Sequence, residues 1–139
     1  MNIRKFATGG IRDTANGKLD YYGTRHPLLE QSFARFMQGH SKMPDGSFRP
    51  TTNWWKGWDK EISLQSLIRH LEDLQAINAG YCVIETRKAD GSVEKTYVNE
   101  ETPVSGDIKT MHVIDAEDAC NAIRFNAMAY LLQIIDKSK

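Results

Sequence analysis

Four acidic side chains on two predicted helices have the type and spacing of ligands for a divalent cation. Asp115 and Asp118 are three residues apart at the start of one helix, so they share a face. Glu72 and Asp73 lie on the other helix. Clustered carboxylates on packed helices commonly hold a hard cation such as Mg²⁺, which takes oxygen ligands and also binds substrate phosphates. The alternative is that Asp115 and Asp118 are exposed acids at the start of the helix, where the helix dipole stabilises negative charge.

A histidine lies close to the second acidic pair. His70 borders the apolar stripe of its helix, where a histidine more often makes a hydrogen bond within the core than binds a ligand. The neighbouring Glu72 and Asp73 favour a functional role for the His70 side chain, so both interpretations stay open. Catalysis by a cysteine nucleophile is disfavoured, because neither Cys82 nor Cys120 has a histidine close in sequence. The sequence also has no adjacent His-Asp pair, no phosphate-binding P-loop and no dinucleotide glycine motif.

Three predicted helices position these side chains, over residues 27–40, 60–79 and 115–136. The first two have apolar residues along one face, and the last is apolar on most faces, which is typical of the buried centre of a domain. Asn121 and Asn126 interrupt the apolar run of the last helix. Because a buried amide without its hydrogen bonds costs about 1–3 kcal/mol, we expect each asparagine to have a polar partner.

Between the second and third helices the period of the sequence changes. Residues 81–99 contain two alternating segments that flank Asp90-Gly91, which is the signature of a β-hairpin with a tight turn. The charges on its outer face predict a surface insertion, which could be a lid or a dimer contact. Residues 100–110 are expected to be a linker, and residues 111–114 a short extended segment that leads into the last helix.

Residues 1–25 are predicted to form an irregular arm that is rich in glycine and other turn residues. Glycines let the backbone approach a ligand, and the side chains of Arg12 and Lys18 suit phosphate oxygens. The alternative is a loose N-terminal arm without a ligand. Residues 41–52 are expected to be a polar loop with turn chemistry.

All three tryptophans lie within residues 53–58, in the order Asn-Trp-Trp-Lys-Gly-Trp. Such a cluster either plugs one end of the helices or offers a platform on which a nucleobase stacks. The plug is favoured for at least one ring, and contact with a ligand stays open for another.

Composition bounds the classes of protein to which the chain belongs. Its 139 residues suffice for one domain with its own core. Lys and Arg number 18, as do Asp and Glu, and this balance argues against generic binding of duplex nucleic acid. No segment reaches the roughly 18 uncharged apolar residues of a membrane span. We therefore expect a soluble intracellular protein that has no membrane partner, with Cys82 and Cys120 as buried free thiols.

Several short motifs, taken in order, resemble a bacteriophage family named for dATP/dGTP diphosphohydrolase, which is itself similar to the all-α MazG-like nucleotide pyrophosphohydrolases. The resemblance spans nearly the whole chain, with the hairpin at 81–99 as an elaboration. The motifs are Gly10-Ile11-Arg12-Asp13 with Gly17-Lys18, Asn53-Trp54 with Lys56-Gly57, Arg69-His70, and Asp118-Ala119-Cys120 with Phe125-Asn126.

This resemblance implies a fold and an activity. The implied fold is mainly α, a MazG-like helical bundle with a small β-hairpin insertion, formed as a single domain over residues 1–139. The implied reaction is hydrolysis of a (deoxy)nucleoside triphosphate, a purine dNTP being favoured, to the monophosphate and pyrophosphate. It depends on Mg²⁺, with Mn²⁺ as the alternative ion. The protein would act as a homodimer or homotetramer in the cytoplasm of a phage-infected bacterium.

The resemblance also implies a role for each site residue. The metal ligands would be Asp115, Asp118 and Glu72, and the catalytic residues Glu72, Asp73 and His70. Substrate would be bound by Arg12 and Lys18 at the phosphates, by Asn53 and Trp54 at the base or sugar, and by Arg69 and Asn126. Asp115-x-x-Asp118 resembles the Glu-x-x-Asp pair of the MazG-like enzymes, but their Glu-x-x-Glu pair is not intact. This incomplete acid set favours the first alternative, a nucleotide-binding phage protein that sequesters its ligand without catalysis. The second alternative is a structural helical protein whose acids are surface charges.

Overall fold

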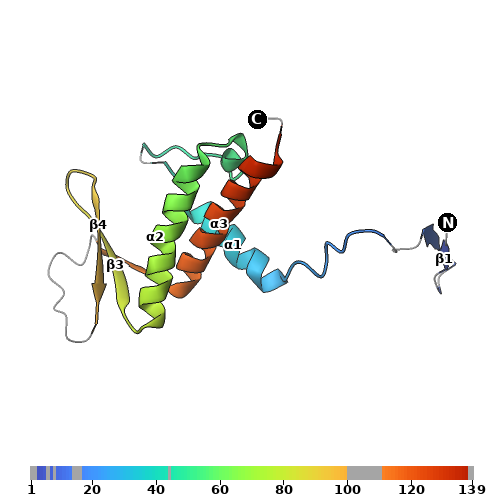
Figure 1. The fold of residues 1–139 in the computed structure, drawn as a ribbon, viewed down its shortest axis with the longest axis horizontal. Coiled ribbons are helices and arrows are strands. Elements are labelled where there is room, and N and C mark those ends of the chain that lie inside the picture. Colours follow the sequence, from blue (N-terminus) through green and yellow to red (C-terminus); the bar gives the residue numbers. More distant parts are fainter. Residues whose placement is uncertain are drawn as a thin grey trace. The chain divides into compact units, whose positions relative to one another are not determined.

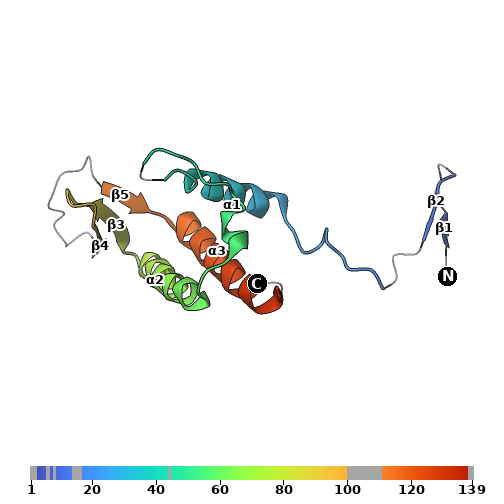
Figure 2. The same cartoon turned by 90° about the horizontal axis from the view of Figure 1, so that it is seen from above.

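The computed structural model describes residues 3–5, 7, 9–13, 17–43, 45–99 and 111–137. The chain divides into two units, Met1–Gln31 and Ser32–Lys139, which we describe separately. In the first unit, β1 (Ile3–Lys5) pairs antiparallel with β2 (Ile11–Asp13), as Figure 2 shows. The arm that the sequence predicts as irregular therefore contains a small two-stranded ribbon.

The described part of the chain contains three α-helices. They are α1 (Pro27–Gly39), which begins in the first unit, α2 (Lys60–Asn78) and α3 (Ala116–Ile135), and a 3₁₀ turn, η1 (Asn53–Lys56), precedes α2. The three predicted helices are thus confirmed to within one residue at each end. Figures 1 and 2 show α2 and α3 side by side, with α1, from Ser32 onward, along one side of the pair.

An aspartate caps each of the two long helices. Asp59 Oδ1 accepts a hydrogen bond from the Glu61 N–H at 3.0 Å. Asp115 Oδ1 accepts one from the Asp118 N–H at 2.8 Å. Both carboxylates thus satisfy first-turn N–H groups that have no partner within the helix. The cap of α3 thus engages one oxygen of Asp115, which is a predicted metal ligand.

The remaining strands form one antiparallel sheet in the order β4-β3-β5. The predicted hairpin is present as β3 (Cys82–Arg87) and β4 (Val93–Val98). Its turn contains Gly91, whose positive φ of +87° is a conformation that favours glycine. On the other edge of β3, β5 (Met111–Ile114) pairs so that His112 lies opposite Glu85.

The expectation of a mainly α, MazG-like bundle with a small hairpin insertion is wrong. The described residues form a small α+β protein, in which a three-stranded sheet packs against α2 and α3. The reason is β5, which leads directly into α3 and ties the hairpin to it. Val83 of the sheet is fully buried in one cluster with Ile114 and Ala119. The sheet therefore forms part of the core.

Two other sequence-based expectations concern solvent exposure. Among the described residues, no helix combines the length and the hydrophobicity needed to cross a bilayer. Cys82 and Cys120 are free thiols, but both are exposed, so their predicted burial is wrong. Cys82 precedes the buried Val83 and therefore lies on the other face of the sheet, and Cys120 follows the buried Ala119 around α3.

Candidate functional site

A cavity of about 690 Å³ lies in the second unit, lined by all three helices, the sheet and the segment that leads into α2. The end of α1 and the following segment contribute Phe36, Met37, His40, Ser41, Arg49, Pro50, Thr51, Asn53, Trp54 and Trp58. The other elements contribute Ser66, His70, Glu85, Arg87, His112, Ile114, Asp118, Ala122, Phe125 and Asn126. Ligand pockets usually measure about 300–1,000 Å³, so the cavity has room for a small molecule.

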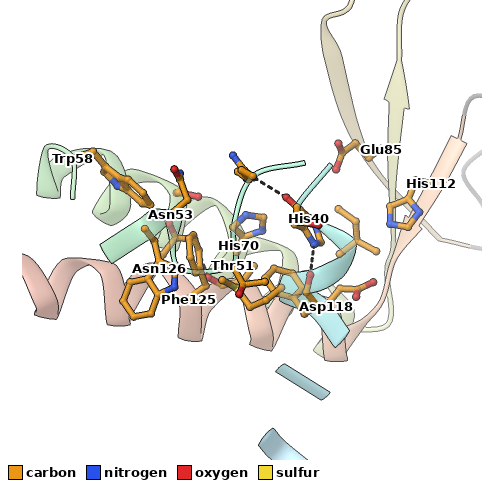
Figure 3. A pocket seen from close by; sticks show the side chains of 18 of the residues that line it. His40, Thr51, Asn53, Trp58, His70, Glu85, His112, Asp118, Phe125 and Asn126 are labelled. Carbon is orange, nitrogen blue, oxygen red and sulfur yellow. Dashed lines mark hydrogen bonds between the residues drawn. The ribbon is translucent and has the colours of Figure 1, made fainter. Parts of the chain in front are cut away.

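One end of the cavity is aromatic and amide-lined, with Trp58, Asn53, Phe125 and Asn126 grouped together in Figure 3. The Phe125 ring centroid lies 6.1 Å from that of Trp54 and 6.1 Å from that of Trp58. Trp58 Nε1 donates to Ser63 Oγ at 2.8 Å, which ties this indole to α2. Trp54 and Trp58 therefore both line the cavity as part of one aromatic wall, in which Trp58 is held against α2.

The opposite end carries titratable groups. Glu85 and His112 are cross-strand partners in β3 and β5, and Asp118 stands in the first turn of α3 (Figure 3). Burial raises the pKa of the Asp118 carboxyl, and the neighbouring charge of Asp115 adds to the effect, while His112 opposes it. Arg87, two residues after Glu85 on the same face of β3, adds a fixed positive charge.

Between the two ends, His70 presents its ring to the cavity above a buried carboxylate. Asp73 is fully buried, and it accepts hydrogen bonds from Lys95 Nζ at 2.9 Å and from Tyr97 OH at 3.1 Å. His70 Nδ1 lies 3.4 Å from Asp73 Oδ2, and this buried nitrogen makes no hydrogen bond. Burial lowers the pKa of His70, and the charge of Lys95 lowers it further, while Asp73 opposes both. These effects together favour the neutral form of the imidazole.

The segment that covers the cavity is fixed to the end of α1. His40 Nδ1 lies 2.8 Å from the Phe36 carbonyl, and the Arg49 guanidinium donates to the His40 carbonyl at 2.8 Å (Figure 3). These bonds hold a second imidazole and a fixed positive charge at the wall of the cavity.

The structure brings together some of the predicted site residues and separates others. Those that line the cavity are Asn53, Trp54, His70, Asp118 and Asn126. Asp73 lies buried behind His70, and Glu72 and Arg69 line a shallower hollow that shares His70 and Glu85 with the cavity. Arg12 is in β2, and Lys18 is exposed, both within the first unit.

The predicted metal ligands lie in three different settings. Asp115 caps α3, Asp118 lines the cavity, and Glu72 lines the neighbouring hollow. Within the described ranges, no group of three or more His, Cys, Asp or Glu side chains is arranged to hold a metal ion. Mg²⁺ often binds through only one or two carboxylates plus substrate phosphates. Asp118 and Glu85, at the titratable end of the cavity, fit this kind of site and not one formed by protein ligands alone.

Sequence reasoning missed several residues of the cavity, notably Glu85, Arg87 and His112. The hairpin was expected to present its charges to solvent, and the segment before α3 was expected only to lead into the helix. One signal was available, because Val83, Glu85 and Arg87 alternate along β3 and so share a face with the buried Val83. The position of His112 opposite Glu85 follows only from the pairing of β5 with β3.

Comparison with protein-family models, with curated proteins and with solved structures gave no match.

Proposed function

We propose that the protein binds a nucleoside triphosphate in this cavity and hydrolyses it to the monophosphate and pyrophosphate. The observation that supports this function best is the convergence of residues from distant motifs. Asn53, Trp54, His70, Asp118 and Asn126 come from three separate stretches of the sequence, and all five line one cavity. These are residues on which the resemblance to the phage dATP/dGTP diphosphohydrolase family rests. A purine dNTP in the cytoplasm of an infected bacterium is therefore the ligand that we favour.

The two ends of the cavity match the two ends of a nucleotide. A base can stack against the aromatic wall of Trp54 and Phe125, since stacking on an aromatic ring is worth about 1–3 kcal/mol per base. The amides of Asn53 and Asn126 lie at the same end and supply donors and acceptors for base edges or sugar. Asn126 Nδ2 already donates to the Ala122 carbonyl at 2.8 Å, which fixes the orientation of its amide.

The triphosphate would extend toward the charged end. Arg49 and Arg87 line the cavity and carry the fixed positive charge that phosphate oxygens need. The acids Asp118 and Glu85 would repel a bare triphosphate but would hold the Mg²⁺, or alternatively the Mn²⁺, that accompanies it. Such an ion would neutralise negative charge on the phosphates.

His70 is the group on this chain that is best placed to act as a general base. Its imidazole, whose pKa is lowered by burial, would accept a proton at Nε2, while Nδ1 lies 3.4 Å from Asp73 Oδ2 without a hydrogen bond. In the reaction, a water oxygen attacks the α-phosphorus, and His70 takes the proton that the water loses. The bond from that phosphorus to the oxygen bridging to the β-phosphate breaks, and pyrophosphate leaves with the bonding electrons.

Binding is tested by calorimetric titration of dATP and dGTP, with Mg²⁺ present, into the wild type and two neighbouring tryptophan variants. Trp54 lines the cavity, whereas Trp55 is 55% exposed and lies outside it. Trp54→Ala should weaken binding by about 1–3 kcal/mol because a stacking surface is lost. Trp55→Ala is the matched control; because the Trp55 ring lies edge-on to that of Trp54, with centroids 6.4 Å apart, this variant should lose less affinity than Trp54→Ala does. Failure of the wild type to bind any nucleotide, or equal losses in both variants, would refute the proposal.

The same samples, assayed for pyrophosphate release, separate catalysis from binding. Turnover by the wild type that His70→Gln abolishes, with affinity for the nucleotide retained, is the result expected of a general base. Binding without turnover in the wild type would instead support the non-catalytic alternative, a protein that sequesters its nucleotide.

A further inference from the structure

We propose that Lys95 of the β3–β4 hairpin is a positioning residue for His70. Lys95 occupies the oxygen of the buried Asp73 carboxylate that the His70 imidazole faces, and it thereby keeps the ring unpaired at the wall of the cavity. The inference rests on the proposed function in one respect, the role of His70 as a base. Its main measurement uses the protein without nucleotide, so the two can fail separately.

The register of the sheet brings Lys95 to α2. Lys95 and Tyr97 are two residues apart on β4, so their side chains share a face. Their partners on β3 are Glu85, opposite Lys95, and Val83, opposite Tyr97. Val83 is fully buried in the cluster against which α2 packs. The same face of the hairpin therefore carries the Lys95 ammonium to Asp73, which lies one turn after His70 on α2.

Two nitrogens approach one oxygen of Asp73. Lys95 Nζ donates to Oδ2 at 2.9 Å, whereas His70 Nδ1 lies 3.4 Å from the same atom. A hydrogen bond from N–H to oxygen usually measures about 2.7–3.2 Å, and this buried nitrogen makes none. The other oxygen, Oδ1, accepts from Tyr97 OH at 3.1 Å. Lys95 thus prevents a close pair between His70 and the carboxylate.

The position of Lys95 determines how readily His70 takes a proton. Burial lowers the pKa of His70, the charge of Lys95 lowers it further, and Asp73 raises it. Loss of the lysine would remove one lowering effect and would open Oδ2 to the imidazole, and both changes raise the pKa. A general base accepts a proton only in its unprotonated form. Lys95 therefore keeps His70 competent as a base to lower pH.

Other titratable or charged side chains surround His70 on both sides. Those in the shallower hollow, besides Lys95, are Arg69, Glu72, Glu85 and Tyr97. Those in the cavity are His40, Arg49, Glu85, Arg87, His112 and Asp118. Among all these described groups, the charges that shift the pKa of His70 are those of Lys95, Asp73 and Arg69. Lys95 is thus the cation whose removal should matter most.

A pH titration of the imidazole proton signals by NMR, without nucleotide, tests the proposal. His70→Gln identifies the signal of His70. Lys95→Met should move the midpoint of that signal to higher pH by about one pH unit or more, the usual scale for a charge at close range. Lys88→Met is the matched control and should leave the midpoint in place. Lys88 lies at the other end of the hairpin, pairs with Glu94 at 3.2 Å and lines neither hollow.

Two further variants separate the charge of Lys95 from a general loosening of the network. Lys95→Arg keeps the charge and should keep the midpoint of the wild type. Tyr97→Phe removes the donor to Oδ1, which is not the oxygen that His70 faces, so it should move the midpoint less than Lys95→Met does. No upward movement in Lys95→Met, or an equal movement in Tyr97→Phe or Lys88→Met, would overturn the proposal.

The wild type alone provides a test that does not require Lys95→Met to fold. Protonated His70 competes with Lys95 for Oδ2, so the side-chain signals of Lys95 should change with the midpoint of His70, and those of Lys88 should not. Lys95 signals that ignore this midpoint would overturn the proposal.

The pH dependence of turnover connects the result to the proposed function. In Lys95→Met, the acidic limb of the kcat profile should move to higher pH by as much as the midpoint of His70 does. An acidic limb that stays in place would show that Lys95 does not act on a base. A protein that binds no nucleotide but shows the predicted NMR midpoints would refute the proposed function and leave the effect of Lys95 on His70 standing.

Discussion

The two sides of the α2–α3 pair differ in polarity. The side that lines the cavity carries Ser66, His70, Asp118 and Asn126 beside the apolar Ala122 and Phe125. The side that helix geometry turns away from the cavity carries only partly covered apolar side chains, those of Leu64, Ile68, Leu71, Leu131 and Ile134. An isolated domain normally turns its polar residues outward and its apolar residues toward its core. The polar side chains of the cavity are thus the groups that we assign to the proposed ligand.

Buried polar side chains of α2 and α3 have partners, as the sequence requires of them. Asn121 Nδ2 donates to Ser32 Oγ at 2.9 Å, and Ser32 Oγ donates to the Glu117 carboxylate at 2.6 Å. Asn126 bonds the backbone of its own helix. The exception is Nδ1 of His70, which is buried without a hydrogen bond. An unpaired buried nitrogen is more common at functional sites than in ordinary cores, which is consistent with the role proposed for His70.

The largest effect on the free energy of unfolding is expected from Asp73→Asn. This substitution removes the buried charge through which α2 bonds Lys95 and Tyr97 of β4. Lys95, only 26% exposed, would lose its partner at 2.9 Å. Breaking a buried ion pair costs about 3–5 kcal/mol, and we expect about 3 kcal/mol because Lys95 keeps some contact with water. Urea unfolding measures the loss. The matched control is Glu72→Gln, whose exposed side chain should matter by less than about 0.5 kcal/mol. Equal losses in the two variants would contradict the assigned network.

Asp118→Asn is expected to change the free energy of unfolding by a smaller amount, and this change depends on pH. Because the pKa of Asp118 is raised in the folded state, its contribution to stability is full below the unfolded pKa of about 3.9 and is lost as pH rises through the folded value. Asp118→Asn removes this loss. The free energy of unfolding of the variant, relative to the wild type, should therefore increase between about pH 4 and pH 7, by less than about 1 kcal/mol. A difference that does not change with pH would show that the carboxyl is not perturbed.

Local signals sufficed to predict the helices but not the sheet. The capping residues Asp59 and Asp115 and the apolar period of each helix lie within a few residues of one another, so the helices could be delimited from the sequence. The hairpin was likewise visible from its turn at Asp90-Gly91. The pairing of β5 with β3 joins Glu85 to His112 across 27 positions of the sequence, and no local pattern specifies it. That pairing determines the fold class.

The same distinction, between local signals and long-range pairing, explains which residues of the site could be predicted. His70, Asp118 and Asn126 were predicted because each sits on a helix whose position in the sequence was clear. Glu72 and Asp73 could not be told apart, since adjacent helical residues differ by about 100° in direction and the location of the sheet was unknown. The sheet supplies Lys95 and Tyr97 as partners for Asp73, and Glu72 stays exposed.

A nucleotide bound as proposed would contact the cavity side of the α2–α3 pair and not the side that carries Ile68 and Leu131. Methyl NMR spectra recorded during a titration with dATP and Mg²⁺ test it directly. Shifts are expected for methyl groups that line the cavity, those of Thr51, Ile114 and Ala122, while those of Ile68 and Leu131 stay in place. Shifts confined to Ile68 and Leu131, or no shifts up to millimolar nucleotide, would contradict binding of the nucleotide in the cavity.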